Sequence, residues 1–218
     1  MRHLVVALLL FISVFTFSQT QYPVVVMETT HGTMKIMLYD DTFRHSDNFL
    51  KLVNDGYYDG QLFHRVINNF MIQTGDHLSK DAQAGVYLGH GGKQYTIEAE
   101  IFSQYYHKKG ALAAARQGDR TNPDRRSAGS QFYIVLGQVY DTLILDKFVQ
   151  KGMHVPFTPE QEIVYTTIGG TPHLDYSYTV FGEVIEGLNI IDRIAFVATD
   201  DRDRPIEDVK IYKMYTEK

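Results

Sequence analysis

The 218-residue chain contains no cysteine, which removes several classes of site at once. It can form neither a disulfide framework nor a lipid-anchored cysteine, so its core alone must stabilise it. Positively charged residues are also fewer than negatively charged ones. The chain has 21 Lys+Arg against 26 Asp+Glu, a net charge of -5 and no dense basic run. Because a phosphate backbone requires a surplus of cations, nucleic acid is not expected as the main partner.

Common signatures of hydrolases, metal sites and nucleotide sites are missing as well. No Gly-x-Ser-x-Gly stretch is present, which argues against a serine hydrolase. His64, His77 and His90 are scattered and lack the spacing of metal ligands on a helix. The stretch "GHGGK" lacks the first glycine of a nucleotide loop and is followed by Gln94 instead of Ser or Thr. We expect a loop there, and neither a metal nor a cofactor.

The first residues, "MRHLVVALLLFISVFTFSQTQ", differ in character from the rest of the chain. Arg2 is followed by an apolar stretch that is short for spanning a bilayer, and Ser18 is compatible with cleavage. This pattern predicts a signal peptide over residues 1–18 and a periplasmic or secreted protein with no membrane contact after cleavage. A membrane anchor is the alternative.

With 44% hydrophobic and 22% charged residues, the remainder reads as one globular domain over residues 19–218. The run "VVVMETTHGTMKIMLYDD" predicts a hairpin around His31-Gly32, and "FRHSDNFLKLVNDG" predicts a helix that ends near Gly56. Further short strands are expected over Gln61–Ile67 and Phe70–Thr74, and within "SQFYIVLG", "YTVFGEV" and "EDVKIYKMYTE", whereas "GALAAAR" is a run of small residues that ends in Arg116. Many short strands and few helices predict an antiparallel sheet closed into a barrel, with helices at its ends.

Side-chain alternation along the strands gives the first indication of a site. In "LFHRVI", Phe63, Arg65 and Ile67 share one face and His64 lies on the other, core-facing side. His64 is therefore expected to be a hydrogen-bonded structural histidine. The face of Arg65 could be shared by Met71, Gln73, Gln131 and Tyr133. Either these side chains form one apolar surface with hydrogen-bonding groups, or the sheet face is simply solvated.

Four ordered segments resemble the motifs of cyclophilin-type peptidyl-prolyl cis-trans isomerases: "FHRVINNFMIQTGD", "GALAAAR", "GSQFYIV" and "HLDYSYTVFGEVIEGLNIID". The resemblance runs from about Val24 to the C-terminus, apart from residues 138–172. It implies a mainly β protein, a closed eight-stranded antiparallel barrel capped by two α-helices, with a substrate groove on its outer surface. It also implies isomerisation of X-Pro bonds, here during folding of exported proteins. The alternative is a proline-motif binding module or a holdase chaperone with little turnover.

The resemblance also implies roles for individual residues. Arg65 matches the catalytic arginine, and Gln73 matches a glutamine that supports it. The remaining matches are substrate-binding positions in the proline pocket, groove and rim: Phe70, Met71, Ala115, Arg116, Gln131, Tyr133, His173, Leu174 and Tyr178. The implied partners are proline-containing peptides and unfolded or folding exported proteins, and nothing demands more than a monomer.

Four positions depart from the family pattern. Tyr133 replaces the usual phenylalanine and adds a hydroxyl at the pocket wall, and Arg116 replaces asparagine and puts a cation beside the groove. His173 stands where the family often has tryptophan, which disfavours strong binding of the macrocycle cyclosporin because an indole contact is lost. Tyr178 replaces a histidine and still supplies an aromatic, hydrogen-bonding rim.

Residues 138–172 form an insertion, predicted to be partly helical from "DTLILDKFVQKGM" and "TPEQEIVYTTIGG". Both ends of the insertion fall close to residues of the expected groove. We predict a lid or extra wall that narrows the choice of substrate. An inert surface insertion is the alternative, since such insertions cost little stability. The charged run Asp200–Pro205 reads as a solvated turn.

Overall fold

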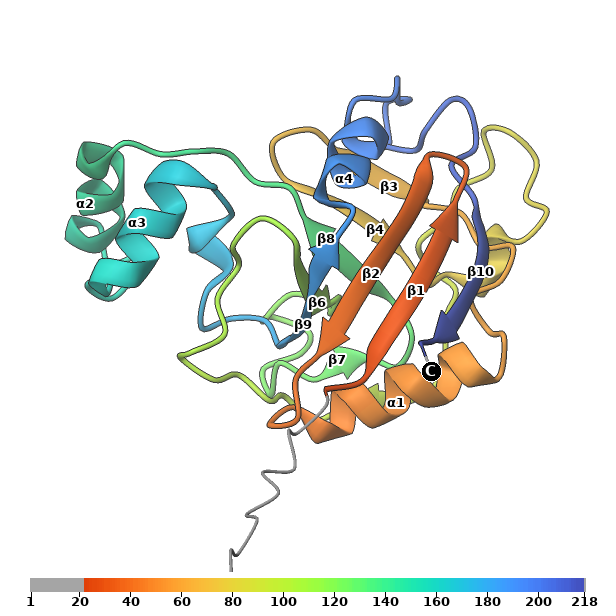
Figure 1. Ribbon diagram of the computed structural model, residues 1–218, viewed down its shortest axis with the longest axis horizontal. Helices are drawn as coiled ribbons and strands as arrows, with labels where there is room; N and C mark the ends of the chain where they lie inside the picture. Colours follow the sequence, from red (N-terminus) through yellow and green to blue (C-terminus); the bar gives the residue numbers. More distant parts are fainter. Residues whose placement is uncertain (1–21, 218) are drawn as a thin grey trace, which may run out of the picture.

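An eight-stranded antiparallel sheet forms the frame of the protein, as seen in the computed structural model, which describes residues 22–217 (Figure 1). The predicted signal peptide therefore lies outside the described residues. The elements follow in the order β1 Val24–Thr29, β2 Gly32–Leu38, α1 Phe43–Asn54, β3 Arg65–Ile67, β4 Met71–Thr74, η1 His77–Ser79, β5 Thr96–Ile97, β6 Ala111–Ala114, β7 Ser127–Ala128, β8 Phe132–Val135, α2 Thr142–Gln150, α3 Pro159–Thr167, η2 Pro172–Leu174, β9 Val180–Glu186, α4 Leu188–Ala195 and β10 Ile211–Thr216. Strands β5 and β7 form a separate pair.

The sheet has the order β10-β1-β2-β9-β6-β8-β4-β3 and does not close into a barrel. Its edge strands β10 and β3 do not pair with each other. The chain beside them spans the gap, through the isolated bridge Leu62↔Lys210 and through hydrogen bonds that include Phe63 N to Val209 O at 2.9 Å and Val66 N to Asp203 O at 2.8 Å. The prediction of a closed barrel was therefore wrong, while the mainly β, antiparallel architecture is confirmed. The physical reason is that the free edge of the short strand β3 is hydrogen-bonded to the loop containing Asp203 and not to β10.

Local sequence signals account for the first elements. Strands β1 and β2 pair as the predicted hairpin, with Gly32 at φ 132° next to the turn. Met34, Ile36 and Leu38 are fully buried, as their alternation predicts. Helix α1 ends at the predicted place, followed by Gly56 at φ 64°. Left-handed backbone is accessible to glycine without the Cβ clash that other residues meet.

The main core fills the inner face of the curled sheet. Ile72, Phe132 and Ile134 belong to this core, with exposed fractions of 2% or less. The prediction that Phe132 and Ile134 fill the interior is thereby confirmed. Helices α1 and α4 pack against the sheet at its opposite ends (Figure 1). No helix within residues 22–217 is both long enough and apolar enough to cross a bilayer.

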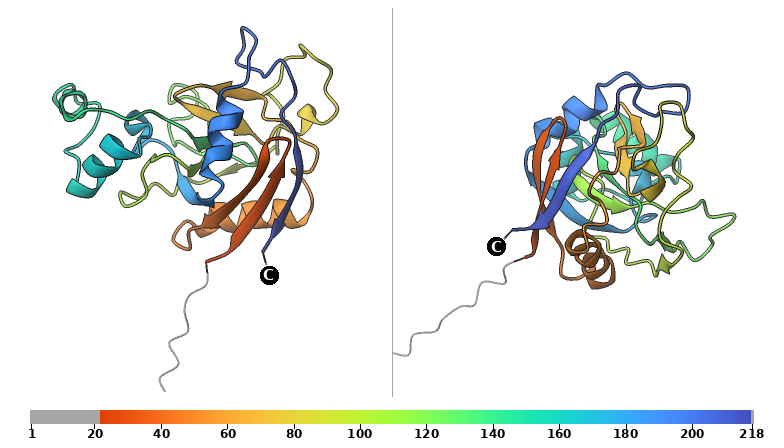
Figure 2. Two further views of the ribbon diagram at one scale, coloured as in Figure 1. Left: turned by 45° about the horizontal axis from the view of Figure 1, so that its top comes forward. Right: turned by 90° about the vertical axis from the view of Figure 1, so that its right-hand side faces the viewer.

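The insertion stands out to one side of the sheet, as the predicted helical unit (Figures 1 and 2). Asp141 caps α2, and Thr158 forms a capping box with Gln161 at the start of α3. The two helices enclose a small core of Tyr140, Leu145 and Tyr165. The insertion returns to the sheet at Gly170, where an added Cβ would lie 2.2 Å from the carbonyl oxygen of His107.

Candidate active site

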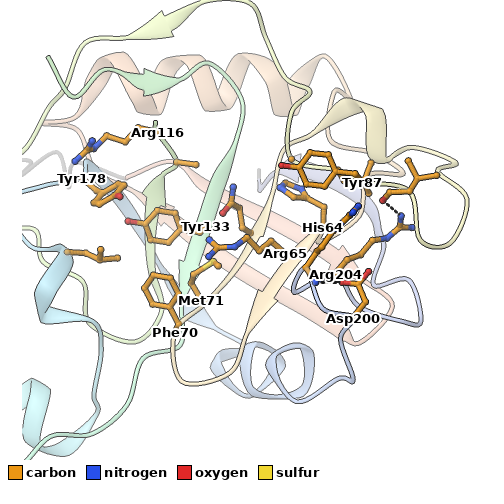
Figure 3. Close-up of a pocket in the computed structure, with 17 residues that line it drawn as sticks. His64, Arg65, Phe70, Met71, Tyr87, Arg116, Tyr133, Tyr178, Asp200 and Arg204 are labelled. Carbon is orange, nitrogen blue, oxygen red and sulfur yellow. Dashed lines mark hydrogen bonds between the residues drawn. The ribbon is translucent and has the colours of Figure 1, made fainter. Parts of the chain in front are cut away.

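A cavity of about 360 Å³ opens on the outer face of strands β3, β4, β6 and β8 (Figure 3). Figure 3 shows Arg65 in its middle, with an aromatic and apolar side and a more polar side. The side with predicted site residues is lined by Phe70, Met71, Gln73, Ala115, Arg116, Tyr133, Leu174 and Tyr178. The other side is lined by His64, Val86, Tyr87, Leu88, Gly89, Asp200, Arg202 and Arg204. Among the described residues that line the cavity, none belongs to 138–172.

Strand pairing brings the apolar wall together. In the β4–β8 pair, Gln73 lies opposite Tyr133 and Ile72 lies opposite Ile134. Because side chains alternate, Met71 and Tyr133 turn outward while Ile72 turns into the core. Met71 and Tyr133 form a second apolar cluster with Val180, against which Phe70, Ala115, Leu174 and Tyr178 pack. The outer face of the sheet is therefore an organised apolar surface rather than a solvated one.

Arg65 lies on edge strand β3, opposite Gln73 in the neighbouring strand. Its Nε lies 3.5 Å from Oδ2 of Asp203, and the two side chains are 42% and 44% exposed. Such a half-exposed pair holds the guanidinium loosely and leaves its other donors free for a ligand. The run Asp200–Pro205 is therefore not merely a solvated turn. Asp200, Arg202 and Arg204 line the cavity, and Asp203 is the carboxylate beside the arginine.

The two predicted glutamines form a hydrogen-bonded pair. Gln73 Nε2 donates to Gln131 Oε1 at 3.0 Å, and Gln131 Nε2 donates to the carbonyl oxygen of Gly89 at 3.0 Å. This pair ties the loop around Gly89 to the sheet. Gln131 lines a neighbouring cavity of about 660 Å³, which shares Gln73, Ala115 and Arg116 with the first.

The rim beyond the apolar wall is made by Arg116, Tyr178 and His173. The Arg116 guanidinium carbon lies 4.3 Å from the centre of the Tyr178 ring, and its Nη1 pairs with Asp119 at 2.6 Å. With 4% of its side chain exposed, Arg116 is stacked into the rim rather than extended into the groove. His173 stacks on Phe70 with ring centres 5.7 Å apart, and burial lowers its pKa.

His64 is buried, but it lines the same cavity as Arg65 instead of facing the core, and Phe63, predicted to share the face of Arg65, is the residue that lies in the core. His64 is also not bonded as predicted. It is 4% exposed, yet neither ring nitrogen has a hydrogen-bond partner. The expectation of a hydrogen-bonded structural histidine was wrong, because the ring lies at the polar side of the cavity instead of inside a hydrogen-bonded core. Burial lowers the pKa of His64 to about 4, so the ring is neutral at pH 7.

This burial predicts a pH dependence of stability. The folded-state pKa of His64 is about 4 and the unfolded value 6.5, so between these pH values the unfolded chain binds a proton that the folded chain does not. Acidification from pH 7 to pH 4 should therefore reduce the free energy of unfolding, by about 3 kcal/mol from this group alone. We expect His64→Leu to flatten the dependence over that range, as measured by urea unfolding at several pH values. An unchanged slope in the variant would contradict the assignment.

Sequence reasoning missed the polar side of the cavity. Its residues come from two loops that carry no periodic pattern, at residues 86–89 and 200–204. The one available signal was the charge run at Asp200–Pro205, which is dense for a simple turn. Arg204 is only 5% exposed and donates to the carbonyl oxygens of Gln83 and Val86, so it joins the two loops.

Known proteins are similar to this chain along most of its length. A protein from Staphylococcus haemolyticus, assigned by its name as a peptidyl-prolyl cis-trans isomerase, is 36% identical over 189 residues, covering 86% of this chain and 87% of the relative. A Streptococcus pyogenes relative, assigned as a bifunctional phosphatase/peptidyl-prolyl cis-trans isomerase, is 36% identical over 195 residues, and the match spans 37% of its length.

A solved structure shares the fold. The cyclophilin type peptidyl-prolyl cis-trans isomerase of Cryptosporidium parvum, crystallised in the presence of the dipeptide Ala-Pro, aligns with a TM-score of 0.63 at 22% identity. The alignment covers 89% of this chain and 99% of that one. Residues 24–216 match the family described as cyclophilin type peptidyl-prolyl cis-trans isomerase/CLD. The chain belongs to this family and is a cyclophilin-type peptidyl-prolyl cis-trans isomerase.

Proposed function

We propose that the cavity around Arg65 is the site at which this isomerase catalyses the cis-trans isomerisation of X-Pro bonds. The observation that carries the proposal is a half-exposed guanidinium placed between an apolar wall and a polar wall. A proline ring fits the apolar side, between Phe70, Met71, Tyr133 and Leu174. The peptide flanking the proline then lies within reach of Arg65 and Gln73.

The chemistry requires a single well-placed cation. The X-Pro amide resists rotation with a barrier of about 18–20 kcal/mol, because the nitrogen lone pair is delocalised into the carbonyl. In the twisted transition state that lone pair is localised and accepts a hydrogen bond. A guanidinium N–H directed at the prolyl nitrogen therefore stabilises the twisted state more than either planar isomer. This route needs neither a cofactor nor a nucleophile.

The wall residues have a separate task, which is to hold the ring while the rest of the peptide rotates. Met71 and Tyr133 are nearly inaccessible and well packed, so the surface they offer is preorganised. We propose that Ala115 and the backbone of Arg116 align the peptide along the groove, with Gln131 fixing the loop on the opposite side. The Arg116 guanidinium covers one face of the Tyr178 ring, so this face is closed to the ligand.

We propose proline-containing, folding exported proteins as substrates. The support is the composition of residues 1–18, an apolar stretch behind Arg2. The loss of a tryptophan at position 173 also leads us to propose weak binding of cyclosporin.

The test is isomerisation of a short X-Pro peptide, followed by NMR exchange, and in parallel the proline-limited refolding of a full-length protein. We expect the wild type to accelerate both reactions. Wild-type protein that binds the peptide without accelerating its isomerisation would sink the proposed site. A titration of the protein with the same peptide, followed by NMR, measures binding separately from isomerisation. It distinguishes a protein that binds without catalysis from one that does not bind.

A second candidate, a holdase chaperone, is favoured by the surface of the insertion. Large apolar side chains are exposed there, among them Leu143 at 70%, Ile163 at 62% and Val139 at 56%. Exposed apolar patches commonly mark contact surfaces for polypeptides. Acceleration of refolding without acceleration on the short peptide would favour this candidate over catalysis at the cavity.

A further inference from the structure

The insertion touches the proposed proline pocket from behind, through a buried hydrogen-bonded cluster. Asp175 is the centre of this cluster and follows Leu174, which lines the pocket. Oδ1 of Asp175 accepts from the backbone N–H and the ring Nδ1 of His107, at 2.8 and 2.9 Å. Its Oδ2 accepts from Tyr165 Oη at 2.6 Å and from His154 Nε2 at 3.0 Å. His154 and Tyr165 both belong to the insertion.

The cluster continues from His107 to the pocket wall. The hydroxyl of Tyr133 lies 3.0 Å from His107 Nε2. Because Nδ1 of His107 faces the Asp175 carboxylate, Nε2 is the ring nitrogen that pairs with the Tyr133 hydroxyl. Burial raises the pKa of Tyr133 well above its ordinary value, which keeps this hydroxyl protonated. The ring of Tyr133 is thereby fixed from its far end while its face lines the cavity.

His154 is held on both sides of its ring. Its Nδ1 faces the carbonyl oxygen of Val155 and its Nε2 lies 3.0 Å from Oδ2 of Asp175. His154 also stacks on Phe157, with ring centres 3.8 Å apart. The insertion thus supplies a buried imidazole and a hydroxyl to one carboxylate.

We propose that His154 and Tyr165 are positioning residues for the isomerase reaction, which hold the Tyr133 wall of the proline pocket through Asp175 and His107. The insertion then supports the pocket wall from behind, a role that we call the buttress. It is neither a lid over the pocket nor an inert surface insertion. Without this support the Tyr133 ring would sample other orientations, and the pocket would bind the proline ring less well. The proposal rests on the proposed role of Tyr133 as a wall of that pocket.

The mildest test is Tyr165→Phe, which removes one donor to Asp175 and leaves the ring in place. Because the pocket wall binds the planar and twisted peptide alike, its loosening should raise KM more than it lowers kcat. We expect KM for a short X-Pro peptide to rise on the order of fivefold, with kcat changed less than about twofold. Glu162→Gln is the matched control, because Glu162 lies on the same helix, is exposed, and is not among the residues that line the cavity. Its KM should equal the wild-type value.

A double-mutant cycle tests the route. Tyr133→Phe keeps the aromatic wall and cuts the hydrogen bond to His107. If the insertion acts through Tyr133, Tyr165→Phe should have little further effect on KM in the Tyr133→Phe background. Effects that multiply would overturn the proposed route. A Tyr165→Phe variant with a lower melting temperature but wild-type KM would overturn the positioning role itself.

The outcome is separable from that of the proposed site. Wild-type activity of an Arg65→Ala variant would refute the proposed site, and with it the proposed role of the buttress. An inactive Arg65→Ala variant together with an unaltered Tyr165→Phe variant would leave the site standing and remove only the buttress.

Discussion

Arg65→Ala should reduce kcat/KM for an X-Pro peptide by about 10²–10³-fold while leaving the fold intact. The substitution removes the cation that we place against the prolyl nitrogen in the twisted state. Since Arg65 is half-exposed and its one carboxylate partner is also half-exposed, its removal leaves no buried charge behind. Peptide binding should weaken less than turnover, because the lone pair becomes available only in the transition state. NMR exchange spectroscopy measures both quantities on one sample.

Arg65→Lys adds a sharper comparison. Lysine keeps the charge but lacks the planar fork of donors, so we expect most of the loss to persist. Arg193→Ala serves as the control arginine, since Arg193 lies on α4 and outside the residues that line the cavity. A melting temperature close to wild type must accompany each result. Retention of more than about a third of wild-type kcat/KM in Arg65→Ala would refute the assigned role, given the size of loss expected for such a donor.

Asp175→Ala should produce the largest loss of stability. The carboxylate accepts hydrogen bonds from His107, His154 and Tyr165, all of them buried, and its removal leaves these groups without their acceptor. Because each buried donor left unsatisfied costs about 1–3 kcal/mol, we expect a loss of about 3–5 kcal/mol. For a chain of this size, the melting temperature should fall by roughly 10 °C. Calorimetry at pH 7 measures the change.

The control is Asp55→Ala. Asp55 pairs with Lys51 on the surface, and that exposed pair contributes little, so its melting temperature should stay near the wild-type value. An Asp175→Ala variant as stable as the Asp55→Ala variant would show that the cluster is not a structural centre.

The lowered pKa of Asp175 also predicts how the free energy of unfolding depends on pH in the acid range. Burial alone would raise its pKa, but the hydrogen bonds from His107, His154 and Tyr165 prevail and lower it to about 2, against an ordinary value of 3.8. The stability it contributes is therefore present above about pH 4 and is lost as the pH falls towards 2. From these two values the contribution is about 2–3 kcal/mol. Its window lies below that of His64, so the two groups can be separated in a pH series.

The limits of sequence reasoning show at particular residues. Alternation placed Met71, Gln73 and Tyr133 on one face, because strand side chains alternate strictly and the signal is local. The capping box of α3 was visible for the same reason, since Thr158 and Gln161 are three residues apart. Whether the sheet closes depends on how its two edges meet. That contact involves Val66 and Asp203, which no local pattern connects.

By itself, the sequence determined most of the elements, the outward face of β4 and β8, and the motif positions that assign the chain to the cyclophilin-type isomerases. Only the tertiary structure decided that Asp203 stands beside Arg65, that His64 lines the cavity without a hydrogen-bond partner, and that the insertion contacts Asp175. These contacts join segments far apart in the chain, so their energy depends on how the whole sheet curls. Local propensities act over a few residues and carry no information about such long-range contacts. The chemistry of the pocket wall, set by Tyr133, His107 and Asp175, is therefore a property of the fold.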